Sequence, residues 1–468
     1  MALDEKYFSL AEVLAVAERH PFYAPGVQYP PHKDAILAIR EQVAARAHTP
    51  DLSSQPLLWK SSLYKTIERL VDDTDPQNTF RQGIYASTTG GGSSPKPLFF
   101  ATDVAENRQQ RLAFGRFLGT VGLVTERDWV VTIHSAGELY RSLDLTLELL
   151  ENGGASVLAA GQFMLPEAVI NLIIKYHANV LAGDSTQIVN MVHYISSLPK
   201  SEREKFKLDK IIYTSESLTP GQRAQIHSVL GADLMICSLL GSAEAGPYGF
   251  SCPNITGKNQ SGDGTAAYED FVFDTRLTLM EILPATVDEQ DENQTPSPIP
   301  DGEKGAIAQT SLIRLRNPLV RYMTGDVGSL HDLPEQARSF VSQSAWPHLK
   351  VLRLYGRDRR FSFEWSGNYF EFSTLNLLMN EEIAGILQWQ VILEKMVESP
   401  LESRLEFRIL LTRGNGGAKE KISDRIKKFC YVDASLERKF GILFVNDMGD
   451  FVRSPGARKV IKFVDRQD

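Results

Sequence analysis

A segment rich in hydroxyl groups and glycine, YASTTGGGSSPKP at residues 85–97, has the composition of a phosphate-binding loop. Glycine has no Cβ, so backbone N–H groups and neighbouring hydroxyls can come close to phosphate oxygens. The segment has neither the G-x-x-x-x-G-K-[ST] spacing of a Walker loop nor the G-x-G-x-x-G spacing of a dinucleotide site. We therefore interpret it as a phosphate-binding loop of another kind, with an ordinary surface loop as the alternative.

Three further motifs carry charged residues suited to nucleotide chemistry. Glu244 follows the sequence LGSA, Asp326 ends the sequence RYMTGD, and Arg357 lies within YGRD. A carboxylate can accept two hydroxyl protons at once, or it can bind a hard cation such as Mg²⁺. An arginine can contact phosphate oxygens. An exposed loop glutamate, an ordinary Gly-Asp turn and a surface arginine are the alternatives for these three residues.

In this order, the four motifs resemble the signatures of the adenylate-forming ligase superfamily: an S/T/G-rich loop, YGxxE, YxTGD and a GRxD hinge. A finer resemblance is to its phenylacetate–CoA ligase-like branch. It rests on PFY at 21–23, on LLWKSSL at 57–63 and on PLVRY at 318–322. The likeness runs from about residue 20 to the C-terminus.

The resemblance implies an AMP-forming ligase that uses ATP and Mg²⁺. Such an enzyme converts a small carboxylic acid, aromatic acids included, to an acyl-adenylate. It then transfers the acyl group to a thiol such as CoA or to an amine. The alternative is a catalytically impaired relative that binds nucleotide or acyl-adenylate in a regulatory or interaction role. A homodimer is a further expectation.

The resemblance also assigns nucleotide contacts to individual residues. In the phosphate loop these are Ser87, Thr88, Thr89, Gly90 and Lys96. A turn facing the adenine would be formed by Ser215, Glu216 and Ser217.

The remaining assignments concern the cation and the ribose. Gly241 and Ser242 precede Glu244, which is expected to help hold Mg²⁺ and so to act in catalysis. Asp326 is expected to bind both ribose hydroxyls. Arg357 is expected to reach ribose and phosphate and is a second catalytic candidate.

The C-terminal segment SPGARKVI at 454–461 departs from the branch pattern G-K-A-x-R-V-I. When Val460 and Ile461 are aligned with the pattern, Gly456 stands where the family has a catalytic lysine. Lys459 is therefore our catalytic candidate from a shifted position. Substitution by Arg458, or the absence of this lysine function, stays open.

His134 and Tyr140 are candidates for the acid pocket. They follow a predicted strand at the place where the family builds that pocket, and a packed or surface histidine is the alternative. Cys252 stands where some relatives place a zinc thiolate, but no cysteine or histidine follows it at ligand spacing through residue 274. Because a zinc site needs four ligands, we predict no structural zinc.

Composition is consistent with a large enzyme. The chain has 468 residues, a net charge of -8 and three cysteines. The negative charge gives no basic surface for nucleic acid, and three scattered cysteines are too few for a disulfide framework. We find neither a run of 18 apolar residues for a membrane span nor a signal peptide, and so expect a cytoplasmic protein.

Apolar periodicity indicates the elements that must position these residues. The first 81 residues have mostly helical spacing. Short apolar runs at 128–133, 155–160, 178–183 and 210–214 then alternate with helices such as 166–174, which predicts βαβ units and a largely parallel sheet. We expect an α/β fold with a large N-terminal domain at 1–355 and a small α+β cap domain at 356–468.

Overall fold

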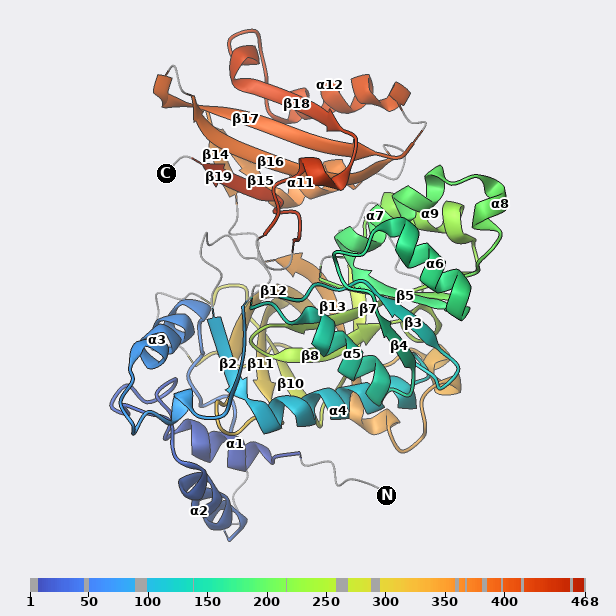
Figure 1. Cartoon of the computed structure of the whole chain (residues 1–468). Helices are drawn as coiled ribbons and strands as arrows, with labels where there is room; N and C mark the ends of the chain where they lie inside the picture. Colours follow the sequence, from blue (N-terminus) through green and yellow to red (C-terminus); the bar gives the residue numbers. More distant parts are fainter. Residues whose placement is uncertain are drawn as a thin grey trace.

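The computed structural model contains a large sheet covered by helices and a second, smaller sheet formed by the C-terminal part of the chain (Figure 1). It describes residues 7–45, 50–88, 99–137, 139–215, 217–257, 268–287, 295–357, 362–366, 368–380, 385–396, 399–413, 416–454 and 458–466. Within these ranges, no helix has both the length and the apolar character needed to cross a membrane.

One half of the large sheet is parallel. Its strands are β3 (Trp129–Thr132), β4 (Ser156–Ala159), β5 (Val180–Asp184), β6 (Lys210–Thr214) and β7 (Met235–Ser242), in the spatial order β7-β6-β5-β3-β4. All five residues of β5 are buried, as expected for a strand covered on both faces. The predicted βαβ units are therefore confirmed in this half.

Helices cover both faces of the parallel half. α4 (Val104–Thr120) and α5 (Ser142–Asn152) share one buried apolar cluster with the sheet. The opposite face is covered by α6 (Pro166–Tyr176), α7 (Ser185–Ser197) and α9 (Pro220–Leu230). α7 begins with a capping box, in which Asp184 accepts from the Gln187 N–H and the Gln187 side chain accepts from the Asp184 N–H. The short helices are α8 (Lys200–Arg203) and α10 (Pro253–Thr256).

The other half of the sheet is antiparallel, so our expectation of a largely parallel sheet is wrong there. Its strands are β8 (Gly246–Ser251), β9 (Glu269–Asp274), β10 (Thr278–Leu283), β11 (Gly305–Ser311), β12 (Tyr322–His331) and β13 (Leu349–Arg357). They complete an 11-stranded sheet in the order β10-β11-β12-β13-β9-β8-β7. Parallel neighbours need a long crossover, usually a helix, whereas β7 and its antiparallel neighbour β8 are joined by the short turn 243–245.

The N-terminal region packs against the antiparallel half. It contains α1 (Leu10–Ala17), α2 (Lys33–Ala44) and α3 (Lys60–Asp72). Just before α3, Leu58 forms a parallel bridge with Tyr322 of β12. A separate two-stranded ribbon consists of β1 (Ile84–Thr88) and β2 (Phe99–Asp103).

The C-terminal part has its own sheet and core. β16 (Ile386–Met396) and β17 (Ser399–Leu411) form an antiparallel pair, flanked by β19 (Phe463–Arg466) and β18 (Phe440–Val445). It also contains α11 (Phe372–Met379), α12 (Lys419–Phe429) and the ribbon β14 (Ser362–Trp365) with β15 (Asn368–Glu371). The predicted small α+β domain is therefore present.

Apolar side chains of the C-terminal part also pack against the large sheet's helices. They belong to the same buried cluster as α6, α7 and α9, and they are Leu387, Leu410, Val445, Met448, Phe451 and Val460. The two parts of the chain therefore share a buried, largely apolar interface.

Candidate active site

The candidate phosphate loop lies between two paired strands. Ser87 and Thr88 are the last residues of β1, and Thr88 stands opposite Phe99, the first residue of β2. The segment after Thr88 lies outside the described part of the chain, and with it the predicted loop residues Thr89, Gly90 and Lys96.

One carboxylate ties β1 to the start of α5. Asp144 Oδ2 accepts hydrogen bonds from Tyr85 OH at 3.1 Å, Arg111 Nη1 at 3.0 Å and Arg141 Nη2 at 2.9 Å. Arg111 also donates to the Tyr85 oxygen, and the Arg141 guanidinium carbon lies 3.9 Å from the Tyr85 ring centroid. The strand that ends in the phosphate loop is thus held by the loop-to-helix segment around residue 141.

His134 follows β3 and is buried, with 1% of its surface exposed. Its Nδ1 lies 2.8 Å from Ser142 Oγ, which fixes the ring from one side. Its Nε2 is buried without a hydrogen-bond partner among the described residues. Burial and then the nearby Lys459 charge lower the pKa of His134 to about 3, so the ring is neutral near pH 7.

Lys459, in the C-terminal part of the chain, lies near enough to His134 for its charge to lower the pKa of the ring. Its Nζ lies 5.9 Å from the Tyr140 ring centroid, and its backbone N–H donates to Ser454 Oγ at 3.1 Å. The structure therefore brings together Lys459, His134 and Tyr140, the catalytic lysine candidate and both acid-pocket candidates. By contrast, the exposed Arg458 points its guanidinium at the Phe163 ring, 4.8 Å from the centroid.

Glu244 lies in the turn between β7 and β8. Gly241 and Ser242 end β7, and Ser242 Oγ accepts from the Ala245 N–H at 3.0 Å. Gly241 is required by a close approach, because a Cβ there would lie 2.8 Å from the Gly246 carbonyl oxygen. The turn places Glu244 in the interior, with 4% of its surface exposed.

Two side chains of α3 contact the Glu244 carboxylate. Lys60 Nζ lies 3.3 Å from Glu244 Oε1, and Tyr64 OH donates to the same oxygen. Burial alone would raise the pKa of Glu244, but the Lys60 charge and the Tyr64 hydrogen bond outweigh it and hold the pKa below its ordinary value. The carboxylate is therefore ionised near pH 7. The sequence comparison singled out Lys60 as a motif residue but missed Tyr64, one helical turn later.

The ionised Glu244 carboxylate is a suitable ligand for Mg²⁺. Mg²⁺ is commonly held by one or two carboxylates together with substrate phosphates. Among the residues that the structure describes, no group of three or more His, Cys, Asp or Glu side chains is placed to hold a metal ion. Glu244 therefore suits an ion shared with nucleotide phosphates rather than one held by protein alone.

The predicted adenine turn follows β6. Ser215 has a φ of 86°, a conformation that is strained for a residue with a side chain. Ser217 Oγ donates to Glu269 Oε2 at 2.7 Å, and Arg223 Nη2 lies 3.1 Å from Glu269 Oε1. Glu216 lies outside the described residues. No motif in the sequence marks Glu269 or Arg223 as supports of this turn.

Asp326 and Arg357 are direct neighbours in the sheet. Asp326 of β12 stands opposite Arg357, the last residue of β13. The Asp326 N–H donates to Thr324 Oγ1 at 3.1 Å, across Gly325, whose φ of 77° favours glycine. The Arg357 side chain is not among those described. Leu354, three residues earlier in β13, stands opposite Glu269, which links this pair to the turn after β6.

No protein-family model and no curated protein sequence matches this chain. Among solved structures, 2-hydroxyisobutyryl-CoA ligase in the postadenylation state, in complex with 2-HIB-AMP, superposes with a TM-score of 0.62 at 16% identity. The match covers 97% of this chain and 87% of that chain.

Other states of the same ligase superpose less closely. At 16% identity over 97% of this chain, the thioesterification state gives a TM-score of 0.52 over 87% of that chain, and an open conformation gives 0.51 over 89%. The chain therefore has the adenylate-forming ligase fold, which confirms the predicted fold class.

Proposed function

We propose that this chain is an AMP-forming ligase that activates a carboxylic acid with ATP and passes the acyl group to CoA or to an amine. One observation carries the proposal. Lys459, from the C-terminal part, lies close to Tyr140 and His134 of the large sheet domain. A lysine that served only as a solvated surface residue would not need to lie beside Tyr140.

In the proposed reaction, a carboxylate oxygen of the acid attacks the α-phosphorus of ATP, and pyrophosphate leaves. Lys459 supplies positive charge beside the reacting groups, and such a fixed charge stabilises the transition state where negative charge develops. His134 is neutral, and its buried Nε2 can form a hydrogen bond with the acid, as donor or as acceptor according to the tautomer. Tyr140 forms one wall of the acid pocket.

Residues of the neighbouring strands β12 and β13 bind the nucleotide in this proposal. Asp326 accepts hydrogen bonds from the ribose hydroxyls, and Arg357 contacts ribose and phosphate. The turn after β6 faces the adenine. The β- and γ-phosphates lie against the loop that begins at Ser87 and Thr88. Mg²⁺, when bound, neutralises phosphate charge, and Glu244 is the residue that would hold it.

The domain division belongs to the same proposal. We place the boundary between residues 355 and 356, close to the end of β13. The large domain then carries His134, Glu244 and Asp326, and the small domain carries Lys459. Acyl transfer to the acceptor would follow a rotation of the small domain that removes Lys459 from the acid pocket.

ATP–pyrophosphate exchange with a panel of carboxylic acids, aromatic acids included, tests the proposal. We expect acid-dependent and Mg²⁺-dependent exchange with at least one acid. Tight ATP binding without exchange for any acid would favour the alternative of a regulatory relative. If ATP neither binds nor exchanges, both functions are excluded.

A further inference from the structure

Two cysteines face each other across the β7–β8 pair. Ser238 of β7 stands opposite Ser251, the last residue of β8. Cys252 follows directly with an extended backbone, so the same register continued by one residue puts it opposite Cys237. Opposite residues in an antiparallel pair have Cα atoms about 4.5–5.5 Å apart, within the span of about 4.4–6.8 Å that a disulfide bridges. Both cysteines are free thiols in the structure.

The two thiols also interact with each other and with a cation. The Cys237 thiol donates a hydrogen bond to the Cys252 sulfur. This bond, against the opposing effect of burial and with the help of the Lys210 charge, lowers the pKa of Cys252 to about 7. The same hydrogen bond, together with burial, raises the pKa of Cys237. Cys252 is thus the more nucleophilic partner, because the thiolate is the reactive form of cysteine.

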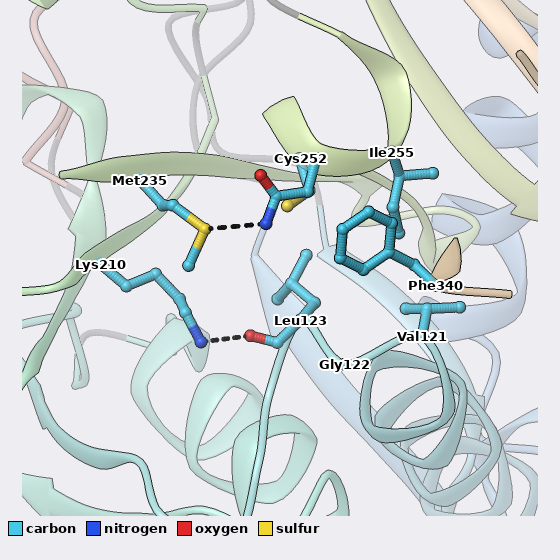
Figure 2. Close-up of a pocket in the computed structure, with 9 residues that line it drawn as sticks. Val121, Gly122, Leu123, Lys210, Met235, Cys252, Ile255 and Phe340 are labelled. Atoms are coloured by element: carbon cyan, nitrogen blue, oxygen red, sulfur yellow. Dashed lines mark hydrogen bonds between the residues drawn. The ribbon is translucent and has the colours of Figure 1, made fainter. Parts of the chain in front are cut away.

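A small cavity lies against Cys252 of this pair. Cys252 and Lys210 line a cavity of about 40 Å³ (Figure 2). Its wall includes the exposed Gly122 and Phe340, which is 43% exposed, so the cavity reaches the molecular surface.

The size of the cavity limits which molecules can reach the Cys252 thiol. One water molecule needs roughly 10–15 Å³ of such space, so the cavity holds a molecule as small as hydrogen peroxide but excludes a peptide disulfide. None of the predicted nucleotide or acid residues lines it.

We propose that Cys237 and Cys252 form a peroxide-reactive dithiol that closes into a disulfide between β7 and β8. The Cys252 thiolate attacks one oxygen of hydrogen peroxide, the O–O bond breaks, and the released hydroxide takes up a proton to become water. Cys252 is now a sulfenic acid. The Cys237 sulfur attacks the Cys252 sulfur, the S–O bond breaks, and hydroxide leaves with the Cys237 proton as a second water. Two thiols are oxidised to one disulfide, and one peroxide is reduced to two waters.

Lys210 adds to the effect of Cys237 in keeping Cys252 charged in this scheme. Its ammonium is buried, donates to Asp128 Oδ2 at 2.9 Å and to the Leu123 carbonyl oxygen at 2.6 Å, and is thereby held beside the cavity. The site does not depend on the proposed ligase activity, because it shares no residue with the candidate active site.

The test is mass spectrometry of the full chain after peroxide treatment, denaturation and alkylation. Cys237 and Cys252 lie in one tryptic peptide, since no Lys or Arg occurs between Arg223 and Lys258. We expect this peptide to lose two hydrogen atoms and to escape alkylation, while Cys430 is alkylated. An unmodified peptide, or oxidation of Cys430 at the same rate, would overturn the proposal.

Two variants test the order of the steps. In Cys237→Ser, we expect Cys252 to accumulate as a sulfenic acid that dimedone traps. In Cys252→Ser, we expect Cys237 to stay reduced under the same treatment. Cys430→Ser is the matched control and should oxidise like the wild type. Rapid oxidation of Cys237 in Cys252→Ser would contradict the assignment of Cys252 as the attacking thiol.

A second oxidant tests access through the cavity. Glutathione disulfide is too large to enter, so we expect it to oxidise the pair far more slowly than hydrogen peroxide does at equal concentration. Equal rates would show that the pair is reached by another route and would overturn the role of the cavity.

Discussion

Lys459 and Arg458 are consecutive residues that face different surroundings. Lys459 lies beside Tyr140 and lowers the pKa of His134, whereas Arg458 is exposed and packs on Phe163. The sequence left open which of the two replaces the family lysine. The geometry favours Lys459, because a cation assists a reaction only where it faces the developing charge.

We expect Lys459→Ala to lower the rate of ATP–pyrophosphate exchange by about 100-fold or more, with ATP affinity little changed, because a fixed charge near the reacting phosphate is lost. Arg458→Ala is the matched control, and its rate should stay within about twofold of the wild type. Steady-state exchange kinetics and ATP titration measure the two effects. Equal losses in both variants would contradict the assignment to Lys459.

His134 makes the stability of the folded chain depend on pH. Its pKa is about 3 in the folded chain, well below the ordinary value of 6.5, because burial and Lys459 disfavour the charged ring. The unfolded chain therefore binds a proton first as the pH falls. The contribution of neutral His134 to stability is full above about pH 6.5 and is lost between pH 6.5 and 3.

We expect His134→Gln to reduce the pH dependence of the free energy of unfolding by up to about 1.4 kcal/mol per pH unit below pH 6.5. Thermal midpoints of the variant and the wild type across this range provide the measurement. His177→Asn is the control, since His177 is exposed and asparagine tolerates its φ of 51°. His20 is buried and has the same direction of pKa change, so some pH dependence should persist in the variant.

At the scale of elements, the β7–β8 hairpin positions Glu244 by a close backbone contact. A Cβ at Gly241 would lie 2.8 Å from the Gly246 carbonyl oxygen and 2.9 Å from Pro247 Cα. Both are backbone atoms, which cannot move aside as the end of a flexible side chain can. The strands would have to separate, and the turn that carries Glu244 would move with them.

We therefore expect Gly241→Ala to destabilise the chain by about 1–3 kcal/mol and to lower exchange activity together with Mg²⁺ dependence. Gly417→Ala is the control, because a Cβ there meets no atom within 4 Å. Thermal unfolding and exchange assays on both variants measure this. An unchanged thermal midpoint in Gly241→Ala would show that the hairpin can relax.

Elements of the parallel half could be predicted closely from the sequence, and those of the antiparallel half could not. The predicted run at 210–214 coincides with β6, because a strand covered on both faces needs a continuous apolar run. In β12 the residues 324–327 are partly buried or exposed, so no such run marks the strand. The sequence pattern therefore did not reveal the antiparallel half of the sheet.

The candidate site shows the same limit. Glu244 and Asp326 could be predicted from short motifs, because local spacing carries the signal. Tyr64 contacts Glu244 across 180 positions in the chain, and Glu269 contacts Ser217 across 52. Only the fold brings such partners together, so a single sequence gives no signal for them.

At the scale of the whole molecule, the small domain is docked by apolar side chains. Met448 and Phe451 are buried in the cluster formed with α6, α7 and α9. Lys459 and the buried Val460 follow in the same C-terminal segment. The position of Lys459 near His134 therefore depends on this apolar interface as well as on local structure.

We expect Phe451→Ala to weaken docking by about 3 kcal/mol, since a large buried side chain is lost. The variant should show a larger radius of gyration in X-ray scattering and reduced exchange activity, while the separate core of the small domain stays folded. Leu443→Ala is the control on the same domain, because Leu443 is 48% exposed. Loss of activity without any change in scattering would argue against a docking role.

The three hydrogen bonds accepted by Asp144 link the positions of three segments of the chain. One oxygen atom holds the strand leading into the phosphate loop, a buried arginine of α4 and the arginine that precedes α5. Any shift of the segment between His134 and α5, such as a bulky guest acid would impose, must pull on β1 through this junction. If the proposed function is correct, this junction couples the shape of the candidate acid pocket to the position of the candidate phosphate loop.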